Sequence, residues 1–137
     1  MGLVYTDITL ENPADVVKAR EGFIKEPDIR RVTAKAMVDT GAWNLVINEA
    51  TRAQLGLHVV KESKAVTAGG KTEPCGITEA VTVRWHDRFV DCNAVVLRNE
   101  DNVLLGAFPL EGMDLMVHPR LETVVGAHGD EPLCLVK

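Results

Sequence analysis

One short motif in this chain could carry acid–base chemistry. Asp39, Thr40, Gly41 and Ala42 directly follow an apolar segment, which places a carboxylate at the end of an expected strand. Such a carboxylate can take a proton from water while a second carboxylic acid donates one to the substrate. The tripeptide Asp-Thr-Gly is also common in ordinary turns, where the aspartate has only a structural role. The residues around the motif must decide between these interpretations.

Other catalytic chemistry has less support in the sequence. Ser63 is the only serine and lacks the glycines of a nucleophile elbow. Cys75, Cys92 and Cys134 include no Cys-x-x-Cys pair, which predicts reduced thiols rather than a disulfide framework or a zinc site. A cysteine nucleophile would need a histidine beside it, and that alternative stays open. The four histidines have no metal-binding spacing, so we expect no metal and no cofactor.

A glycine-rich segment superficially resembles a phosphate-binding loop. Residues 68–72 read Ala-Gly-Gly-Lys-Thr, but Ala65 stands where the first glycine of that loop is required. Pro74 also interrupts the helix that would have to follow. We expect instead a glycine tip between two strands, with residues 64–67 leading in and residues 77–85 leading out.

Length, composition and charge limit the class of protein. The 137 residues are 46% hydrophobic and 26% charged, which predicts one globular domain over residues 1–137. A formal net charge of -5 argues against a nucleic-acid partner. No apolar run approaches the ~20 residues of a membrane span, so no membrane association is expected. No secretory signal is visible, and the expected location is cytoplasmic.

The hydrophobic pattern predicts a mainly β fold with few helices. Alternating or continuous apolar residues predict strands near residues 4–10, 32–38, 45–47, 81–85, 89–97, 117 and 121–125. Asn48 can cap a helix over Glu49–Leu55, with Gly56 ending it in a left-handed conformation. A second short helix is expected to begin at Pro109. Residues 13–20 fit either a helical turn or a hairpin loop.

The order of these features resembles that of the retropepsin-like (retroviral-type) aspartic proteases, particularly their bacterial relatives. An apolar strand runs into Asp39, a helix and a glycine-tipped hairpin follow, and Val103-Leu104-Leu105-Gly106-Ala107 then precedes a second helix. The resemblance covers roughly residues 30–125. It implies a closed β-barrel half-unit with one or two short helices and a flap hairpin, assembled as a twofold dimer.

The resemblance also implies a role for each residue of the motif. Asp39 would activate water for the hydrolysis of a peptide bond, Thr40 would lock two catalytic loops together, and Gly41 would orient Asp39. The backbone of Ala42 would help to hold a polypeptide substrate. The hairpin tip would close over that substrate as a flap and contains Ala68, Gly69 and Gly70.

A single Asp-Thr-Gly poses a problem for this mechanism. The second apolar element carries Val103 where an aspartate would correspond. Because one carboxylate cannot supply both acid and base, the active unit must be a homodimer that contributes Asp39 twice. The apolar run Leu133-Cys134-Leu135-Val136 could add a strand to the dimer, although it could also be a frayed tail.

The chain departs from the retroviral pattern beside the motif. Trp43 stands where an acidic residue usually follows the alanine, and Ala107-Phe108 stands where an arginine usually follows the glycine. The two aromatic residues could instead form an apolar buttress. Two other interpretations stay open: a catalytically silent module that binds a peptide or protein in the same groove, and a small-ligand β-barrel in which Asp39 only caps a turn.

Overall fold

Strands dominate the structure, as the alternating sequence predicts. The computed structural model describes residues 3–134 and 136. Its helices are α1 (Pro13–Arg20), the 3-10 helix η1 (Glu26–Asp28), α2 (Glu49–Leu55) and α3 (Ala107–Gly112). Its strands are β1 (Val4–Glu11), β2 (Arg31–Val38), β3 (Leu45–Ile47), β4 (Val59–Val66), β5 (Thr72–Trp85), β6 (Arg88–Val96), β7 (Leu104–Leu105), β8 (Leu115–His118) and β9 (Thr123–Gly126). Among the described residues, no helix is long and apolar enough to cross a membrane.

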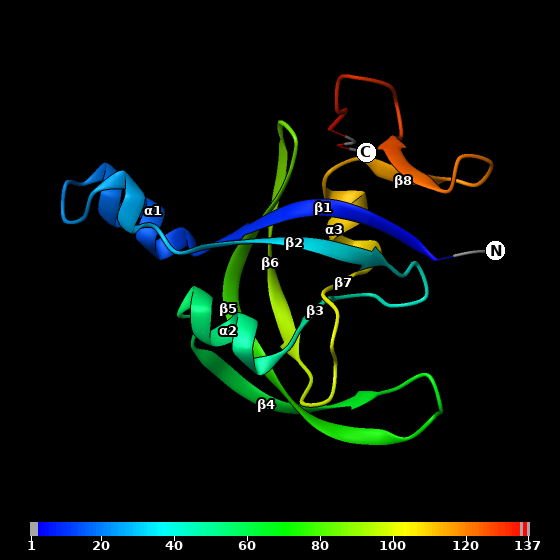
Figure 1. Ribbon diagram of the computed structural model, residues 1–137, viewed down its shortest axis with the longest axis horizontal. Helices are drawn as coiled ribbons and strands as arrows, with labels where there is room; N and C mark the ends of the chain where they lie inside the picture. The colour runs from blue at the N-terminus through cyan, green and yellow to red at the C-terminus, as the bar shows by residue number, and fades with distance from the viewer. Residues whose placement is uncertain (1–2, 135, 137) are drawn as a thin grey trace.

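Seven strands form one sheet whose pairing returns to its first strand. Their order is β1-β2-β7-β3-β6-β5-β4, and β1 also pairs with β5. The strand β4 therefore lies outside this ring, paired to the long strand β5 (Figure 1). Strands β8 and β9 form a separate two-stranded sheet. The mainly β class is confirmed, but the described residues hold three α-helices rather than one or two.

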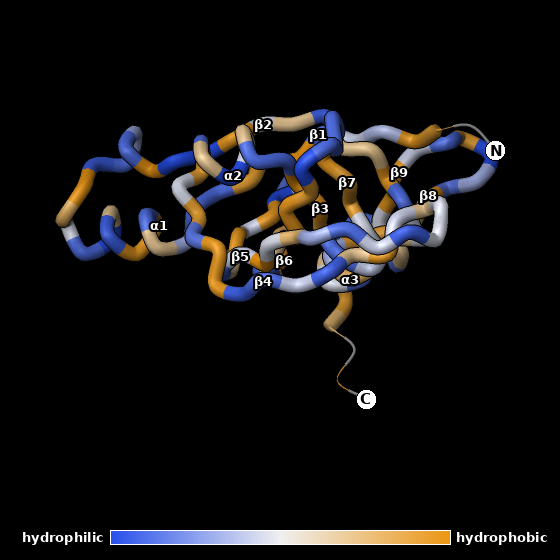
Figure 2. Tube along the Cα trace, turned by 90° about the horizontal axis from the view of Figure 1, so that it is seen from below, coloured by the Kyte–Doolittle hydropathy of each residue, from blue (hydrophilic) through white to orange (hydrophobic). Residues whose placement is uncertain are grey.

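The sheet has an apolar cluster on each of its two faces. In the short strands β3 and β7, Leu45, Ile47 and Leu105 belong to the main core, whereas Val46 and Leu104 belong to a second, smaller cluster. Successive side chains of a strand point to opposite faces, so an uninterrupted apolar run supplies both clusters. Figure 2 shows hydrophobic residues of the central strands gathered in the middle of the molecule.

Two of the sequence predictions are confirmed at their boundaries. Helix α2 spans the expected residues: the side chain of Asn48 accepts a hydrogen bond from the Thr51 N–H (2.9 Å), and Gly56 ends the helix at φ 66°. Strands β5 and β6 are joined by a tight turn in which Trp85 pairs with Arg88. The expected lead-out strand is longer than predicted, because β5 already begins at Thr72.

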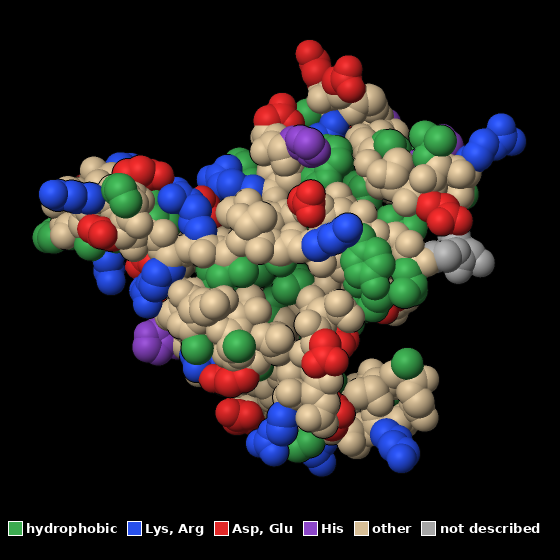
Figure 3. All heavy atoms as spheres, viewed as in Figure 1, with side chains coloured by type: hydrophobic (Ala, Val, Ile, Leu, Met, Phe, Trp, Pro, Cys, Tyr) green, Lys and Arg blue, Asp and Glu red, His purple; other side chains and the backbone are tan. Residues whose placement is uncertain are grey.

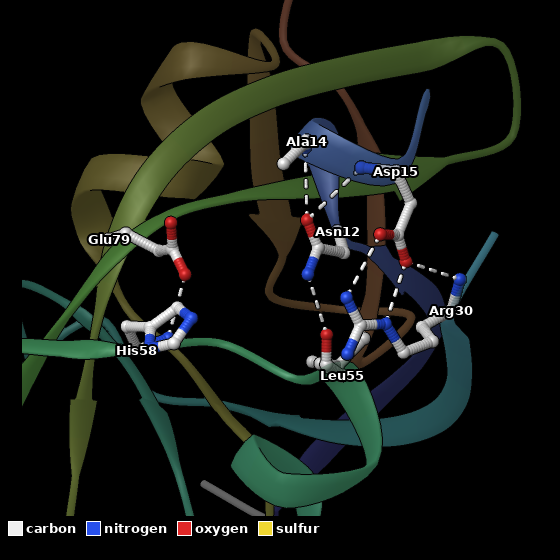
Figure 4. Close-up of polar contacts among 7 residues, drawn as sticks. All are labelled: Asn12, Ala14, Asp15, Arg30, Leu55, His58 and Glu79. Atoms are coloured by element: carbon white, nitrogen blue, oxygen red, sulfur yellow. Dashed lines mark hydrogen bonds and ion pairs between the residues drawn. The ribbon is translucent and has the colours of Figure 1, made fainter. Parts of the chain in front are cut away.

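The residues that fitted either a helix or a loop form α1. The side chain of Asn12 accepts hydrogen bonds from the N–H groups of Ala14 (2.9 Å) and Asp15 (3.4 Å) and donates one to the Leu55 carbonyl (2.8 Å). Asp15 is 3% exposed and forms a two-bond ion pair with Arg30 (2.8 and 2.9 Å). Figure 4 shows these contacts joining the start of α1 to the end of α2. Residues 13–20 therefore form a helix that side-chain contacts stabilise in addition to its backbone hydrogen bonds.

The helix that was expected to begin at Pro109 begins earlier than predicted. Helix α3 starts at Ala107, with Gly106 as its N-cap, rather than at Pro109. The N–H groups of Ala107 and Phe108 donate to the carbonyls of Ala42 (2.8 Å) and Trp43 (2.9 Å). The first N–H groups of a helix need partners outside the helix. Here a loop that is distant in sequence supplies them, so no capping residue marks this helix start in the local sequence.

The end of the described chain is attached to the body by Asp114. Its carboxylate accepts a hydrogen bond from the Leu133 N–H (3.0 Å) and contacts Nδ1 of His128 (2.8 Å). The hydrogen bond from Leu133 and the contact with His128 lower the pKa of Asp114. Leu133 and Cys134 lie in no strand, and Leu135 is outside the described residues. The dimer strand expected here therefore stays a prediction.

Glu11 is a buried carboxylate between two arginines. It is 3% exposed and accepts hydrogen bonds from Nε of Arg31 (2.7 Å) and of Arg84 (2.8 Å). Burial raises the pKa of Glu11, but the hydrogen bonds from the two guanidinium groups outweigh it and hold this pKa below the ordinary value of 4.5. The group thus ties the ends of β1, β2 and β5 together in its ionised form.

We expect this carboxylate to make the free energy of unfolding depend on pH. A lowered native pKa contributes stability above about pH 4.5, and this stability is lost as the pH falls through the native pKa. Glu11→Gln should lower the free energy of unfolding at pH 7 by about 1.5–3 kcal/mol, the typical contribution of hydrogen bonds to a charged group. The same substitution should also make the free energy of unfolding depend less steeply on pH on the acid side. Urea unfolding at several pH values measures both effects, and an unchanged acid slope in the variant would contradict the assignment.

Candidate active site

Asp39 lies in the turn that follows β2. Its N–H donates to the Leu105 carbonyl (3.0 Å), which fixes its backbone against β7. Its Oδ1 accepts the N–H of Gly41 (3.0 Å), and its carbonyl accepts the N–H of Ala42 (3.1 Å). A Cβ on Gly41 would come within 3.2 Å of that same Oδ1. The turn therefore holds a half-buried carboxylate against backbone, with little room for a side chain at Gly41.

The strand β7 wedges between β2 and β3 and supports this turn. It pairs in parallel with β2 through Val38 and Leu105 and antiparallel with β3 through Leu45 and the same Leu105. Gly106 follows directly, and a Cβ there would lie 2.3 Å from the carbonyl oxygen of Asn44. Since this neighbour is backbone, it cannot swing aside as a flexible side chain would. Gly106 is thus required by close approach to the Asp39 turn.

The β4–β5 hairpin forms the expected glycine-tipped structure. At its tip the Thr67 N–H donates to the Lys71 carbonyl (2.9 Å), and the Gly70 N–H donates to the Thr67 carbonyl (2.8 Å). Gly70 has φ 78°, a left-handed conformation that favours glycine. A strand begins at Thr72 where a phosphate-binding loop would need a helix. In Figure 1 this tip and the turn after β2 lie on the same side of the molecule.

A cleft of about 910 Å³ separates the hairpin from the Asp39 turn. Figure 3 shows the surface hollowed between them. Of the residues proposed from the sequence, the cleft is lined by Asp39, Gly41, Ala42 and Ala68. Thr40, Gly69 and Gly70 are exposed and do not line it. The structure therefore brings the carboxylate and one residue of the hairpin tip, Ala68, to one cavity.

Sequence reasoning missed the apolar walls of the cleft. All eight members of the second hydrophobic cluster line it: Met37, Val46, Ala65, Cys75, Ile77, Val95, Leu97 and Leu104. They come from strands that are distant in sequence, so only the sheet brings them together. The alternation within each strand was a usable signal, because it separates Val46 from the core residues Leu45 and Ile47.

Two aromatic residues lie beside the Asp39 turn. The rings of Trp43 and Phe108 pack edge to face with centroids 5.7 Å apart, and they are 60% and 41% exposed. The hydrogen bond from the Phe108 N–H to the Trp43 carbonyl holds the two backbones together. Trp43 also lines the cleft. The buttress expected from the sequence exists, but it lies at the surface and leaves apolar area next to the carboxylate.

The cysteine alternative finds no base in the cleft. Cys75 lines the cavity, but burial, then Glu62 and Glu73, raise its pKa. Burial raises the pKa of Cys92 to about 12. No histidine is among the described residues that line the cleft, and a protonated thiol is a poor nucleophile. Nor do the described residues contain three histidine, cysteine or acidic side chains grouped as a metal ion would need.

Comparison with known proteins identifies the family. The model of the family described as gag-polyprotein putative aspartyl protease matches residues 26–111, which include the Asp39 turn, the β4–β5 hairpin and most of α3. The chain belongs to this family. Its retropepsin-like character, expected from the order of motifs, is confirmed. No curated protein sequence matches the chain.

Solved structures share the fold at low sequence identity. The retroviral protease-like domain of Ddi1 from Leishmania major is 17% identical, with a TM-score of 0.60 over 98% of this chain and 96% of that one. A retropepsin-like aspartic protease from Rickettsia conorii is 21% identical, with a TM-score of 0.52 over 86% of each chain. The EIAV protease in complex with the inhibitor HBY-793 is 16% identical, with a TM-score of 0.51 over 77% of this chain and 82% of that one.

The close approach at Gly106 gives a test of how the site is held. Gly106→Ala would push a methyl group into the backbone of the Asp39 turn, and we expect a loss of about 1–3 kcal/mol in the free energy of unfolding, as for other overpacked sites. Gly69→Ala is the matched control, because a Cβ there meets no atom within 4 Å. Chemical denaturation of both variants measures the difference. Equal stabilities would show that the turn tolerates displacement.

Proposed function

We propose that this chain is an aspartic endopeptidase that hydrolyses peptide bonds as a homodimer. The proposal rests above all on one observation: the carboxylate of Asp39, held by the Gly41 N–H, opens into an apolar cleft beneath a hairpin with a glycine-rich tip. Such a cleft suits an extended polypeptide, whose side chains alternate between its two walls. Membership of an aspartyl protease family supports the same assignment.

The dimer follows from the number of carboxylates that the reaction needs. The other acidic residues of the cleft, Glu73 and Glu100, lie on the hairpin and on the loop after β6 rather than beside Asp39 in its turn. A symmetric second copy would supply another Asp39 across a twofold axis. We infer that each chain is then one half-unit of a barrel-like protease, with exposed Thr40 meeting the opposite loop.

In the proposed reaction the two carboxyl groups share one proton. Two carboxylates held close together cannot both ionise cheaply, so one is a base and the other an acid at the same pH. The ionised Asp39 removes a proton from water while the protonated Asp39 of the second copy donates to the carbonyl oxygen of the peptide. Residues 68–70 of each flap tip would cover the substrate and exclude bulk water.

A silent binding module is the second candidate. The apolar area of the cleft and the exposed Trp43 beside it can hold a polypeptide whether or not hydrolysis occurs. This candidate shares the groove with the first and differs only in the chemistry at Asp39. A direct test of hydrolysis separates them.

Asp39→Asn should abolish hydrolysis of an unstructured polypeptide while leaving the dimer intact. An amide cannot act as the base, and general acid–base catalysis typically contributes about 10²–10⁴-fold. Cleavage assays on a mixed peptide library, with sedimentation of the same samples, measure both properties. Asp7→Asn is a matched control, because Asp7 is an exposed acid on β1. Undiminished cleavage by Asp39→Asn would end the protease assignment.

The hydrolysis rate should pass through a maximum at mildly acid pH. Activity requires one carboxyl group to be ionised and its partner to be protonated, so both more acid and more alkaline solutions lose the active form. Initial rates on one peptide across pH 3–8, corrected for the folded fraction at each pH, define the profile. A rate that rises steadily to neutral pH would argue for a different catalytic group.

A further inference from the structure

The flap hairpin places an acidic residue over the cleft. In the β4–β5 register, Glu73 pairs with Ala65, and Cys75 pairs with Ser63. Residues two apart on a strand share a face, so Glu73 lies on the same face of β5 as Cys75, which is buried in the apolar cluster. Glu73 is half-buried and lines the cavity that also contains Asp39. It is therefore a carboxylate in the wall of an otherwise largely apolar groove.

This carboxylate has no cationic partner among the described residues. None of the ion pairs they form includes Glu73, although they include those of Glu11, Asp15 and Asp114. Lys64 is the one cation among the described residues that line the cleft, and it pairs with Pro74 in the register, which places it on the other face of the hairpin from Glu73. Within the described part of the chain, no cation that lines the cleft therefore lies on the Glu73 face of the hairpin.

A second acidic residue adds to this charge. Glu100 lines the same cleft from the loop between β6 and β7, and its carboxylate accepts a hydrogen bond from the Asp101 N–H (3.1 Å). With Asp39, the cleft then holds three carboxyl groups against one lysine. Figure 3 shows acidic side chains beside the hollow. Low-dielectric walls strengthen the field of such charges within a groove.

We propose that Glu73 is a specificity-determining residue that selects polypeptides carrying a lysine or arginine side chain at one position in the cleft. This proposal rests on the proposed function, because it assigns the substrate class of the same groove. A polypeptide that covers Glu73 removes its water, and an uncompensated carboxylate then disfavours binding. A cationic side chain replaces that water with a charge-assisted hydrogen bond. Apolar side chains of the same polypeptide would occupy the walls around it.

The test compares peptides that differ at a single position. Sets of cleavable peptides would carry lysine, glutamine or glutamate in turn at each position around the cleaved bond, with all other positions apolar. For the wild-type protein we expect kcat/KM at one position to favour lysine over glutamine by about tenfold or more, as a buried charged hydrogen bond typically gives. High salt should reduce this preference only partly, since the cleft is partly enclosed.

Variants of the hairpin then assign the preference to Glu73. Glu73→Gln should bring the lysine-to-glutamine ratio close to one, and Glu73→Lys should shift the preference at that position to glutamate. Glu62→Gln is the matched control. Glu62 lies on the exposed strand β4, where it pairs with Gly76 of β5, and it does not line the cleft. The control should keep the wild-type ratio. A ratio that persists in Glu73→Gln, or is absent from the wild type, overturns the proposal.

Binding measurements keep this inference distinct from the proposed hydrolysis. Fluorescent forms of the lysine and glutamine peptides would be titrated with the wild-type protein and with Asp39→Asn, each with and without Glu73→Gln. If binding prefers lysine and this preference requires Glu73, but the wild-type protein cleaves no peptide, the inference is supported and hydrolysis is rejected. Cleavage with no dependence on residue 73 rejects the inference and leaves hydrolysis standing. If the protein shows no cleavage and no preference that depends on Glu73, both the inference and the proposed hydrolysis are rejected.

Discussion

The close packing of β7 between β2 and β3 is the constraint on which the candidate site depends. Leu105 pairs with both neighbouring strands, and its carbonyl accepts the N–H of Asp39. Gly106 then passes so close to the carbonyls of Ala42 and Asn44 that any side chain there would collide with backbone. A carboxylate at a surface turn is ordinarily mobile. Here hydrogen bonds hold both the N–H and the carbonyl of Asp39, and the Gly41 N–H holds its Oδ1. The carboxylate is therefore positioned by the fold itself.

The elements set by local rules could be predicted from the sequence, and those set by tertiary contacts could not. The ends of α2 at Asn48 and Gly56 were predictable, because capping acts over only three or four residues. The start of α3 was mispredicted because its first N–H groups bond to the loop at Ala42 and Trp43, which is distant in sequence. Residues 13–20 stayed ambiguous although Asn12 and Pro13 are a good helix start, since much of what holds α1 is Arg30 and the end of α2.

The site shows the same division. The motif of residues 39–42 was recognisable because its four residues are contiguous, and the family match spans them. The walls of the cleft come from β2 to β7 and meet only when the sheet forms, so no local pattern predicted them. Glu73 is an intermediate case. Its face on the hairpin follows from simple alternation, but that face becomes the wall of a cleft only because the hairpin lies over β3 and β7.

Strands with two apolar faces connect the core to the cleft in this fold. One face of β3, β6 and β7 builds the core, and the other builds the second cluster, in which Val46, Val95 and Leu104 are buried. The partly buried members of that cluster, Met37, Ala65, Ile77 and Leu97, leave apolar area open to the cleft. Exposed apolar area of this kind is retained where a partner or ligand covers it. Trp43 and Phe108 extend that surface to the edge of the Asp39 turn. Because cleft and core side chains alternate along the same strands, substitutions at residues such as Val46 and Leu104 change the lining of the cleft without entering the main core. The cleft can therefore vary in shape and polarity while the turn that holds Asp39 stays fixed.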